Sequence, residues 1–180
     1  MYGMVNRSIE RMVVADHGED FWERVKRDAG VDVEVFISHE GYSDQLTYAL
    51  LGALSEIEGT PLSEVLVRFG IHWAVVTAQE GYPDLMAAGG RDLREFLINL
   101  PEFHSRVSMV LPHLQPPEFA CSDVAERSLR LHYRSGRAGL APFVLGLVKG
   151  LGQIYETAVE VEPVASKAAG ADHDEFLVRW

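Results

Sequence analysis

Before about residue 116, apolar residues recur at every third or fourth position, and beyond it many alternate with polar residues. The first spacing predicts helices and the second predicts strands. Helices are expected within residues 4–16, 19–29, 43–59, 60–81, 82–89, 91–111 and 139–157. Strands are expected within residues 118–124, 127–135, 158–165 and 173–180. The stretch 31–38 is too short for an assignment.

Residues at the ends of these segments support the helix predictions. Ser43 is placed to cap the third helix at its N-terminus, and Gly59 to end it. Thr60 is the expected cap of the next helix, with Pro61 at its first helical position. Pro101 marks a point where residues 91–111 either break into two helices or continue as one.

The change of pattern indicates an α+β fold of one domain spanning residues 1–180. The prolines at 112, 116 and 117 stop any helix there and separate the two parts. A helical subdomain is expected over about residues 1–115. A sheet subdomain, a small antiparallel sheet with a crossing helix, is expected over about residues 116–180.

Charge and composition exclude several classes of protein. The 180 residues carry a formal net charge of −11, whereas nucleic-acid binding needs a basic surface. An anionic membrane surface is disfavoured for the same reason. Cys121 is the only cysteine, so an internal disulfide and a cysteine-based zinc cluster are excluded. Neither a signal peptide nor a membrane-spanning run is recognisable, and we expect a cytoplasmic protein.

His104 lies in the middle of an apolar stripe. On the helix before the prolines, Leu97, Leu100, His104, Val107 and Leu111 share one face. A buried neutral histidine that is hydrogen-bonded to a carbonyl explains this position. An axial metal ligand in an apolar pocket is the alternative explanation, since one proximal histidine is enough to hold haem iron.

The heptapeptide LHYRSGR, residues 131–137, is a second candidate site. As a strand it would place Tyr133, Ser135 and Arg137 on one face. This donor triad is either a set of solvated side chains or a clamp for a carboxylate or phosphate. A haem explains the triad and His104 together, because it offers an iron in an apolar macrocycle and two propionates.

The sequence gives little support for a zinc hydrolase, a serine hydrolase or a nucleotide-binding site. No pair of histidines has zinc-hydrolase spacing, and His132 faces away from Tyr133 on its strand. Nucleophile-elbow, dinucleotide-binding and phosphate-loop motifs are absent from the sequence. We therefore do not expect an enzyme.

The sequence resembles the H-NOX (haem–nitric oxide/oxygen binding) family, which includes the haem domain of soluble guanylate cyclase and bacterial stand-alone sensors. The resemblance covers essentially the whole chain. It is carried by MYGMVN at the N-terminus, REFLINLPEFHSRV, PPEF, HYRSGRAGL and the closing DHDEFLVRW. A histidine followed about thirty residues later by Y-x-S-x-R is a specific combination.

The resemblance implies haem b as the cofactor and assigns its surroundings. His104 would be the proximal ligand, and the donor triad would bind the propionates. Pro117 would press on the porphyrin and bend it. Met1 and Tyr2 would lie close to the haem.

The resemblance also implies a distal gas pocket that contains Phe143, Trp73, Leu140 and Val144. Oxygen-binding members carry a tyrosine at the position that corresponds to Phe143. The expected protein is therefore a nitric oxide sensor that excludes oxygen and also binds carbon monoxide. Two alternatives stay open: an oxygen-binding haem protein, for which the Trp73 indole N–H would serve as donor, and a haem-free interaction domain on the same scaffold.

Signalling is expected to follow release of the iron–His104 bond, which frees the helix relative to the sheet. Since no kinase or cyclase domain follows residue 180, the output is expected from a separate protein. The resemblance points to a histidine kinase or a diguanylate cyclase/phosphodiesterase.

Overall fold

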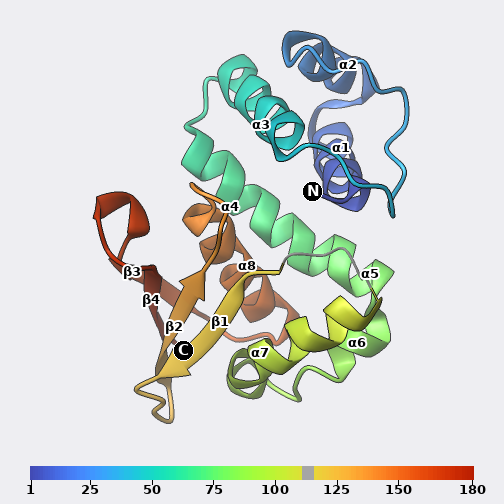
Figure 1. Cartoon of the computed structure of the whole chain (residues 1–180). Coiled ribbons are helices and arrows are strands. Elements are labelled where there is room, and N and C mark those ends of the chain that lie inside the picture. The colour runs from blue at the N-terminus through green and yellow to red at the C-terminus, as the bar shows by residue number, and fades with distance from the viewer. Residues whose placement is uncertain (111–115) are drawn as a thin grey trace.

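A computed structural model of the chain describes residues 1–110 and 116–180. Helices α1 to α3 form one part of the molecule, and the sheet with α7 forms another, with α4 and α8 between them (Figure 1). The helical segments are α1 Gly3–His17, α2 Glu19–Asp28, α3 Asp44–Glu58, α4 Leu62–His72, η1 Trp73–Ala78, α5 Gln79–Gly81, α6 Pro83–Ala87, α7 Leu93–Val110, α8 Ala141–Ile154 and η2 Lys167–Ala169. The strands are β1 Glu118–Ser122, β2 Ser128–Arg134, β3 Glu160–Ala165 and β4 Asp174–Arg179. The α+β prediction is confirmed.

Most helix ends lie where the sequence places them. The Ser43 hydroxyl accepts a hydrogen bond from the backbone N–H of Gln45, and Gly59 ends α3 in the left-handed conformation. The predicted start of the next helix is wrong by one residue. Pro61, with an extended ψ of 137°, occupies the cap position, and its carbonyl accepts the N–H groups of Glu64 and Val65.

The helix predicted over residues 60–81 is not α-helical throughout. After α4 it widens into the π-helix η1 and then returns to one α-turn, α5. A π-helix inserts extra backbone into a turn and is found frequently at functional sites. Its wider turn shifts the side chains of Trp73 and the residues after it around the helix axis.

Helix α7 is one helix that continues across Pro101. Proline lacks an N–H, so the carbonyl of Leu97, four residues earlier, loses its normal partner. The Cys121 thiol on β1 donates to this carbonyl at a sulfur–oxygen distance of 3.3 Å. Of the predicted apolar stripe on α7, Leu97 and Leu100 are buried, and Leu111 lies outside the described residues.

The four strands form one antiparallel sheet in the order β1-β2-β4-β3. In the register, Tyr133 faces Phe119 of β1 and Asp174 of β4, and strand β2 ends at Arg134. The strand predicted within residues 127–135 is therefore confirmed to within one residue at each end, and the strand reading of residues 131–137 holds only as far as Arg134. Ser135 and Arg137 lie in the connection to α8, beyond the last residue pairs of the ladders that β2 forms with β1 and β4.

Two hydrophobic cores meet at α8. The first core lies among α1 to α4, and the second core lies among α7, α8 and the sheet. Val144 belongs to the second core, whereas Phe143 packs against the first. Helices α4 and α8 approach so closely that a Cβ on Gly146 would lie 2.1 Å from the Val67 carbonyl oxygen. A Cβ on Gly70 would lie 2.2 Å from the Phe143 carbonyl oxygen. Because glycine at these two positions has no side chain, α4 and α8 can pack closely, and α8 can contact both cores.

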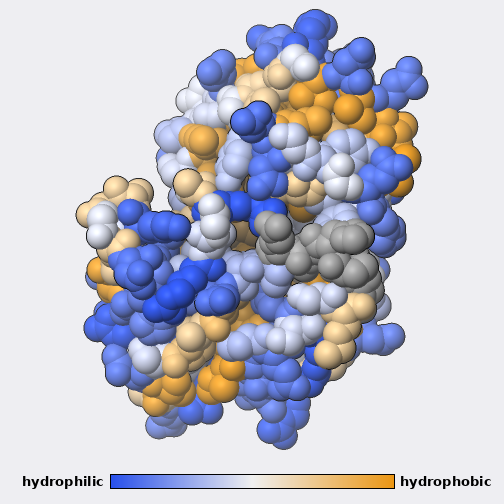
Figure 2. Space-filling model, in the orientation of Figure 1, coloured by the Kyte–Doolittle hydropathy of each residue, from blue (hydrophilic) through white to orange (hydrophobic). Residues whose placement is uncertain are grey.

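Hydrophilic residues cover much of the face shown in Figure 2, over helices and strands alike. Within residues 1–110 and 116–180, no helix combines the length and the apolar character needed to cross a membrane.

Candidate functional site

A cavity of about 540 Å³ lies between the two cores. This volume falls within the range of about 300–1,000 Å³ typical of small-molecule pockets. Its wall is mainly apolar and draws on helices α1, α3, α4, η1, α7 and α8 and strands β1 and β2. Every residue that the sequence nominated lines it: Met1, Tyr2, Trp73, His104, Pro117, Tyr133, Ser135, Arg137, Leu140, Phe143 and Val144. The fold thus brings the predicted site together, and the role of each residue stays a prediction.

His104 is held in one orientation by its own helix. Its Nδ1 atom lies 3.0 Å from the Leu100 carbonyl oxygen, one turn earlier. That bond makes Nδ1 the protonated nitrogen and leaves the lone pair on Nε2. The ring of Phe119 lies 5.0 Å from the imidazole, centroid to centroid. Burial lowers the pKa of His104, which favours the neutral form that a metal ligand requires.

The N-terminal segment is fixed at the cavity by backbone pairing. Tyr2 forms an isolated antiparallel bridge with Gly41, and the N–H of Tyr42 donates to the Met1 carbonyl at 2.7 Å. Tyr2 is buried, at 9% exposure. Pro117 reaches the same cavity from the residues just before β1.

The donor triad adopts a turn rather than a strand beyond Tyr133. The Ser135 hydroxyl accepts from the backbone N–H of Arg137 at 3.0 Å, which folds the two residues toward each other. Burial raises the pKa of Tyr133, although a hydrogen bond with Ser135 opposes this shift. The phenol is therefore a neutral donor near neutral pH. A phenol, a hydroxyl and a guanidinium remain grouped, as an anion clamp requires.

Asp44, in the first turn of α3, is a neighbour of the triad that the sequence reasoning missed. Its Oδ2 accepts from Nε of Arg137 at 2.8 Å, and its Oδ1 lies 2.6 Å from the Met1 ammonium. Burial alone would raise the pKa of Asp44, but hydrogen bonds from the Met1 ammonium and Arg137 outweigh it and lower the pKa. Local sequence carries no signal for a pair separated by 93 residues.

An aromatic cluster at the α1–α4 core faces the cavity. The ring of Phe143 lies 5.1 Å from Phe69 and 6.4 Å from Trp73, centroid to centroid. Phe69 is buried in the α1–α4 core and was not nominated from the sequence. The nominated Leu140 and Val144 flank Phe143 on the same helical turn and add further apolar wall.

Two further polar side chains that the sequence reasoning missed line the cavity. The Tyr82 hydroxyl lies 3.5 Å from the Met4 sulfur, a weak acceptor. The Thr47 hydroxyl donates to Oδ1 of the buried Asn6 side chain at 2.8 Å. Thr47 is committed to that bond, so Tyr82 joins Trp73 as a candidate donor toward a cavity ligand.

The residues present fit a haem. An apolar cavity suits the macrocycle, and a neutral imidazole with its lone pair on Nε2 suits the iron. The triad suits two propionates. Nδ1 of His104 is already bonded to a carbonyl, which is the supporting contact that metal-binding histidines usually have.

Comparisons with known proteins agree with this chemistry. The Haem-NO-binding family profile matches residues 2–163. The chain is 28% identical to soluble guanylate cyclase gcy-31 of Caenorhabditis elegans over 90% of its length, and 32% identical to gcy-35 over 88%. It is 25% identical to soluble guanylate cyclase 89Da of Drosophila melanogaster over 93% of its length. The chain spans about a quarter of each cyclase, covering 23%, 24% and 24% of them respectively.

Solved structures share the fold. An H-NOX protein from S. oneidensis in the Fe(II)NO ligation state superposes with a TM-score of 0.91 at 19% identity, covering 99% of this chain and 98% of that one. The Fe(II) unliganded H-NOX protein from K. algicida gives a TM-score of 0.87 at 22% identity, with coverages of 99% and 96%.

Proposed function

Because the chain belongs to the Haem-NO-binding (H-NOX) family, whose members are haem-based gas sensor domains, we propose that it senses nitric oxide and excludes oxygen. The cofactor in this proposal is haem b. When bound, the haem supplies a ferrous iron that takes diatomic gases. The chain acts as a single domain without catalysis of its own.

One observation carries the proposal. His104 and the triad of Tyr133, Ser135 and Arg137 line the same cavity of about 540 Å³, although they come from α7 and from the end of β2. His104 is proposed to hold the iron through Nε2. The triad is proposed to bind the propionates, Pro117 to press on the macrocycle, and Met1 and Tyr2 to cover it.

The choice of gas follows from the apolar surroundings of Phe143. Leu140, Val144, Phe69 and Trp73 adjoin it, and of these only Trp73 carries an N–H or O–H group. Bound dioxygen depends on a hydrogen-bond donor more than nitric oxide does. Nitric oxide and carbon monoxide are therefore the proposed ligands. An oxygen-binding protein is the second candidate, because the Trp73 indole and the Tyr82 hydroxyl both line the cavity.

The proposed output is a displacement of α7 relative to the sheet. His104 lies on α7 and packs against Phe119 of β1, so a change in a bond between His104 and a bound iron would alter how helix and strand pack. A separate histidine kinase or diguanylate cyclase/phosphodiesterase is the proposed receiver of this change.

His104→Gly tests the axial role. The variant is expected to lose haem on purification and to regain it when imidazole is supplied, because free imidazole replaces the missing ligand. The measurement is the Soret absorbance per protein, with and without imidazole. His72→Gly is the matched control, since His72 also lies on a helix but does not line the cavity. Normal haem retention by His104→Gly without imidazole would contradict the assignment.

The gas proposal has its own test. The reduced, haem-loaded protein is expected to keep its unliganded Soret band in air and to shift it with nitric oxide. A shift of the band in air would favour the oxygen-binding alternative. A well-folded protein that takes up no haem would defeat both.

A further inference from the structure

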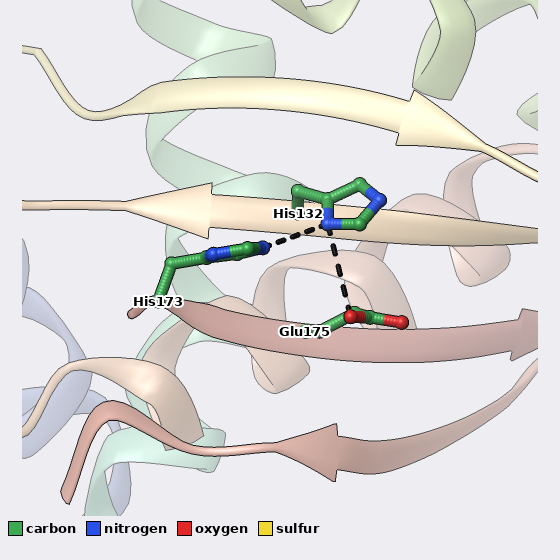
Figure 3. A group of neighbouring side chains, drawn as sticks. All are labelled: His132, His173 and Glu175. Atoms are coloured by element: carbon green, nitrogen blue, oxygen red, sulfur yellow. Dashed lines mark hydrogen bonds and ion pairs between the residues drawn. The ribbon is translucent and has the colours of Figure 1, made fainter. Parts of the chain in front are cut away.

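His132, His173 and Glu175 gather on the face of the sheet opposite the second core. His132 is on β2, Glu175 is its direct partner across the ladder on β4, and His173 immediately precedes β4. The two rings point toward each other, and the Glu175 carboxylate lies beside them (Figure 3). Tyr133, the next residue after His132, faces the buried side. This His–His–Glu cluster is thus separate from the cavity.

The ligand atoms of the cluster are close enough to share one ion. His132 Nδ1 lies 2.8 Å from His173 Nε2 and 3.9 Å from Glu175 Oε2. All three atoms lie within 4.8 Å of one another. Donor atoms on one tetrahedral Zn²⁺, bound at about 2.0–2.2 Å, are about 3.3–3.6 Å apart. Small side-chain rotations would therefore bring the three atoms to binding distance.

The opposite ring nitrogens have the partners that metal-binding histidines use. His132 Nε2 lies 2.7 Å from the Ser122 hydroxyl, and His173 Nδ1 lies 3.2 Å from an Asp172 carboxylate oxygen. A hydroxyl and a carboxylate that accept these N–H groups leave the lone pairs on His132 Nδ1 and His173 Nε2. Those are the two nitrogens that face each other.

The same histidines are also joined by a hydrogen-bond chain. Arg134 lies 3.2 Å from His173 Nδ1 and would donate to it in the other tautomer. His173 Nε2–H would then donate to His132 Nδ1. An ion between the two rings would require the His173 proton on Nδ1, where Asp172 would accept it, and would leave Arg134 with its ion pair to Asp172 at 3.7 Å.

Charge around the cluster supports a cation. Glu175 Oε1 forms an ion pair with Arg130, which also pairs with Asp123. The other carboxylate oxygen, Glu175 Oε2, points toward His132. Hydrogen bonding from Arg130 lowers the pKa of Glu175, so this carboxylate is ionised. Three carboxylates, Asp123, Asp172 and Glu175, thus outnumber the two arginines, Arg130 and Arg134.

We propose that His132, His173 and Glu175 form a binding site for one divalent transition-metal ion, with Zn²⁺ as the best match. Two imidazoles and one carboxylate are a known zinc ligand set, and water would complete the tetrahedron. Imidazole also suits Cu²⁺ and Ni²⁺, whereas Mg²⁺ and Ca²⁺ prefer oxygen ligands alone. All three side chains are half-buried, so an ion can reach them from solvent.

The bound ion would tie β2 to the segment before β4. That segment already contacts the triad, because Lys167 donates from Nζ to the Ser135 carbonyl at 2.9 Å. Zn²⁺ would therefore stabilise the sheet close to the connection that carries Ser135 and Arg137.

Calorimetric titration of ZnCl₂ into the untagged, haem-loaded protein tests the proposal. One saturable site per chain is expected. His173→Ala, in the segment before β4, and His132→Ala, on β2, are each expected to abolish it, and Glu175→Gln to weaken it. Ser122→Ala removes a supporting partner and is expected to weaken binding by about tenfold to a hundredfold. MgCl₂ should give no heat of specific binding.

His17→Ala is the matched control, because His17 also pairs with a glutamate, Glu58, at 2.8 Å but belongs to no such cluster within residues 1–110 and 116–180. It should bind Zn²⁺ as the unmodified protein does. The Soret band and the far-UV circular dichroism of each variant report whether it is folded. Zn²⁺ should also raise the Tm of the unmodified protein and not that of His173→Ala. Absence of a one-site isotherm, or unchanged binding by folded His173→Ala, would overturn the proposal.

Discussion

At the scale of single residues, the surroundings of His104 favour the tautomer and the neutral form that its proposed role as a ligand requires. The Leu100 carbonyl holds Nδ1, so the ring cannot turn without losing a hydrogen bond. Burial favours the neutral imidazole. The rings of Phe103 and Phe119 lie 5.6 Å and 5.0 Å from it and restrict it further. These protein contacts thereby fix the orientation of Nε2.

Phe143 is the residue on which the proposed choice of gas rests. Phe143→Tyr adds one hydroxyl to the aromatic cluster and supplies a donor to the cavity. We expect the reduced, haem-loaded variant to change its Soret band in air, unlike the unmodified protein. Absorbance spectra under air and under argon measure this. Phe143→Leu, which adds no donor, is the control. A Soret band of Phe143→Tyr that does not change in air would count against the assignment of this position.

At the scale of elements, α7 combines a proline with the residue that is proposed to bind iron. Pro101 lies one turn before His104 and leaves the Leu97 carbonyl to the Cys121 thiol. Burial raises the pKa of this thiol to about 11, so it stays protonated and able to donate. Cys121 therefore joins β1 to α7 next to the site.

A double-mutant cycle tests this link. Cys121→Ala should lower the free energy of unfolding by about 1 kcal/mol, because it leaves a buried carbonyl unpaired. Pro101→Ala restores the helical N–H to Leu97. In that background Cys121→Ala should cost clearly less, as measured by urea denaturation. Equal costs in both backgrounds would show that the thiol acts only through packing.

Helices α4 and α8 depend on glycine for their close approach. Gly146→Ala would place a methyl group against the Val67 carbonyl, which belongs to rigid backbone. We expect a loss of about 3 kcal/mol in the free energy of unfolding, at the upper end for overpacking.

Gly52→Ala is the control for this prediction. Gly52 also lies inside a helix, α3, but a Cβ there meets nothing within 4 Å. This substitution should be neutral or stabilise the protein by up to about 1 kcal/mol, since alanine favours helix. If both substitutions had the same effect on urea unfolding, the close α4–α8 contact would not be the cause.

At the scale of the whole molecule, the cavity lies between the two hydrophobic cores. Its wall includes Leu66 and Phe69 from one core and Leu131 and Val144 from the other. The ion pair of Arg137 with Asp44 also joins the connection after β2 to α3. A ligand in this position would contact both cores at once.

Removal of haem should therefore destabilise the molecule more than loss of a surface ligand would. The haem-free protein is expected to melt at a lower temperature, because the cofactor binds only the folded state. Amide exchange should quicken first in α7 and at the start of α1, which line the cavity. Thermal unfolding and hydrogen exchange of both forms measure this, and identical Tm values would contradict it.

Local sequence determined most of the elements of this protein. The apolar spacing on α3, with Ser43 and Gly59 at its ends, and the alternation on β1 and β2 are short-range patterns. Short-range steric and hydrogen-bonding rules decide such segments. The site residues His104, Tyr133 and Arg137 could also be nominated, since their residue types and spacing are unusual for a solvated surface.

Tertiary structure alone decided how these parts meet. The π-helix after α4, the end of β2 at Arg134 and the pairing of Asp44 with Arg137 depend on contacts between segments far apart in the chain. The His–His–Glu cluster likewise exists only because β2 and β4 pair in one register. Local propensity cannot predict such contacts, because their free energy arises only when distant segments pack together.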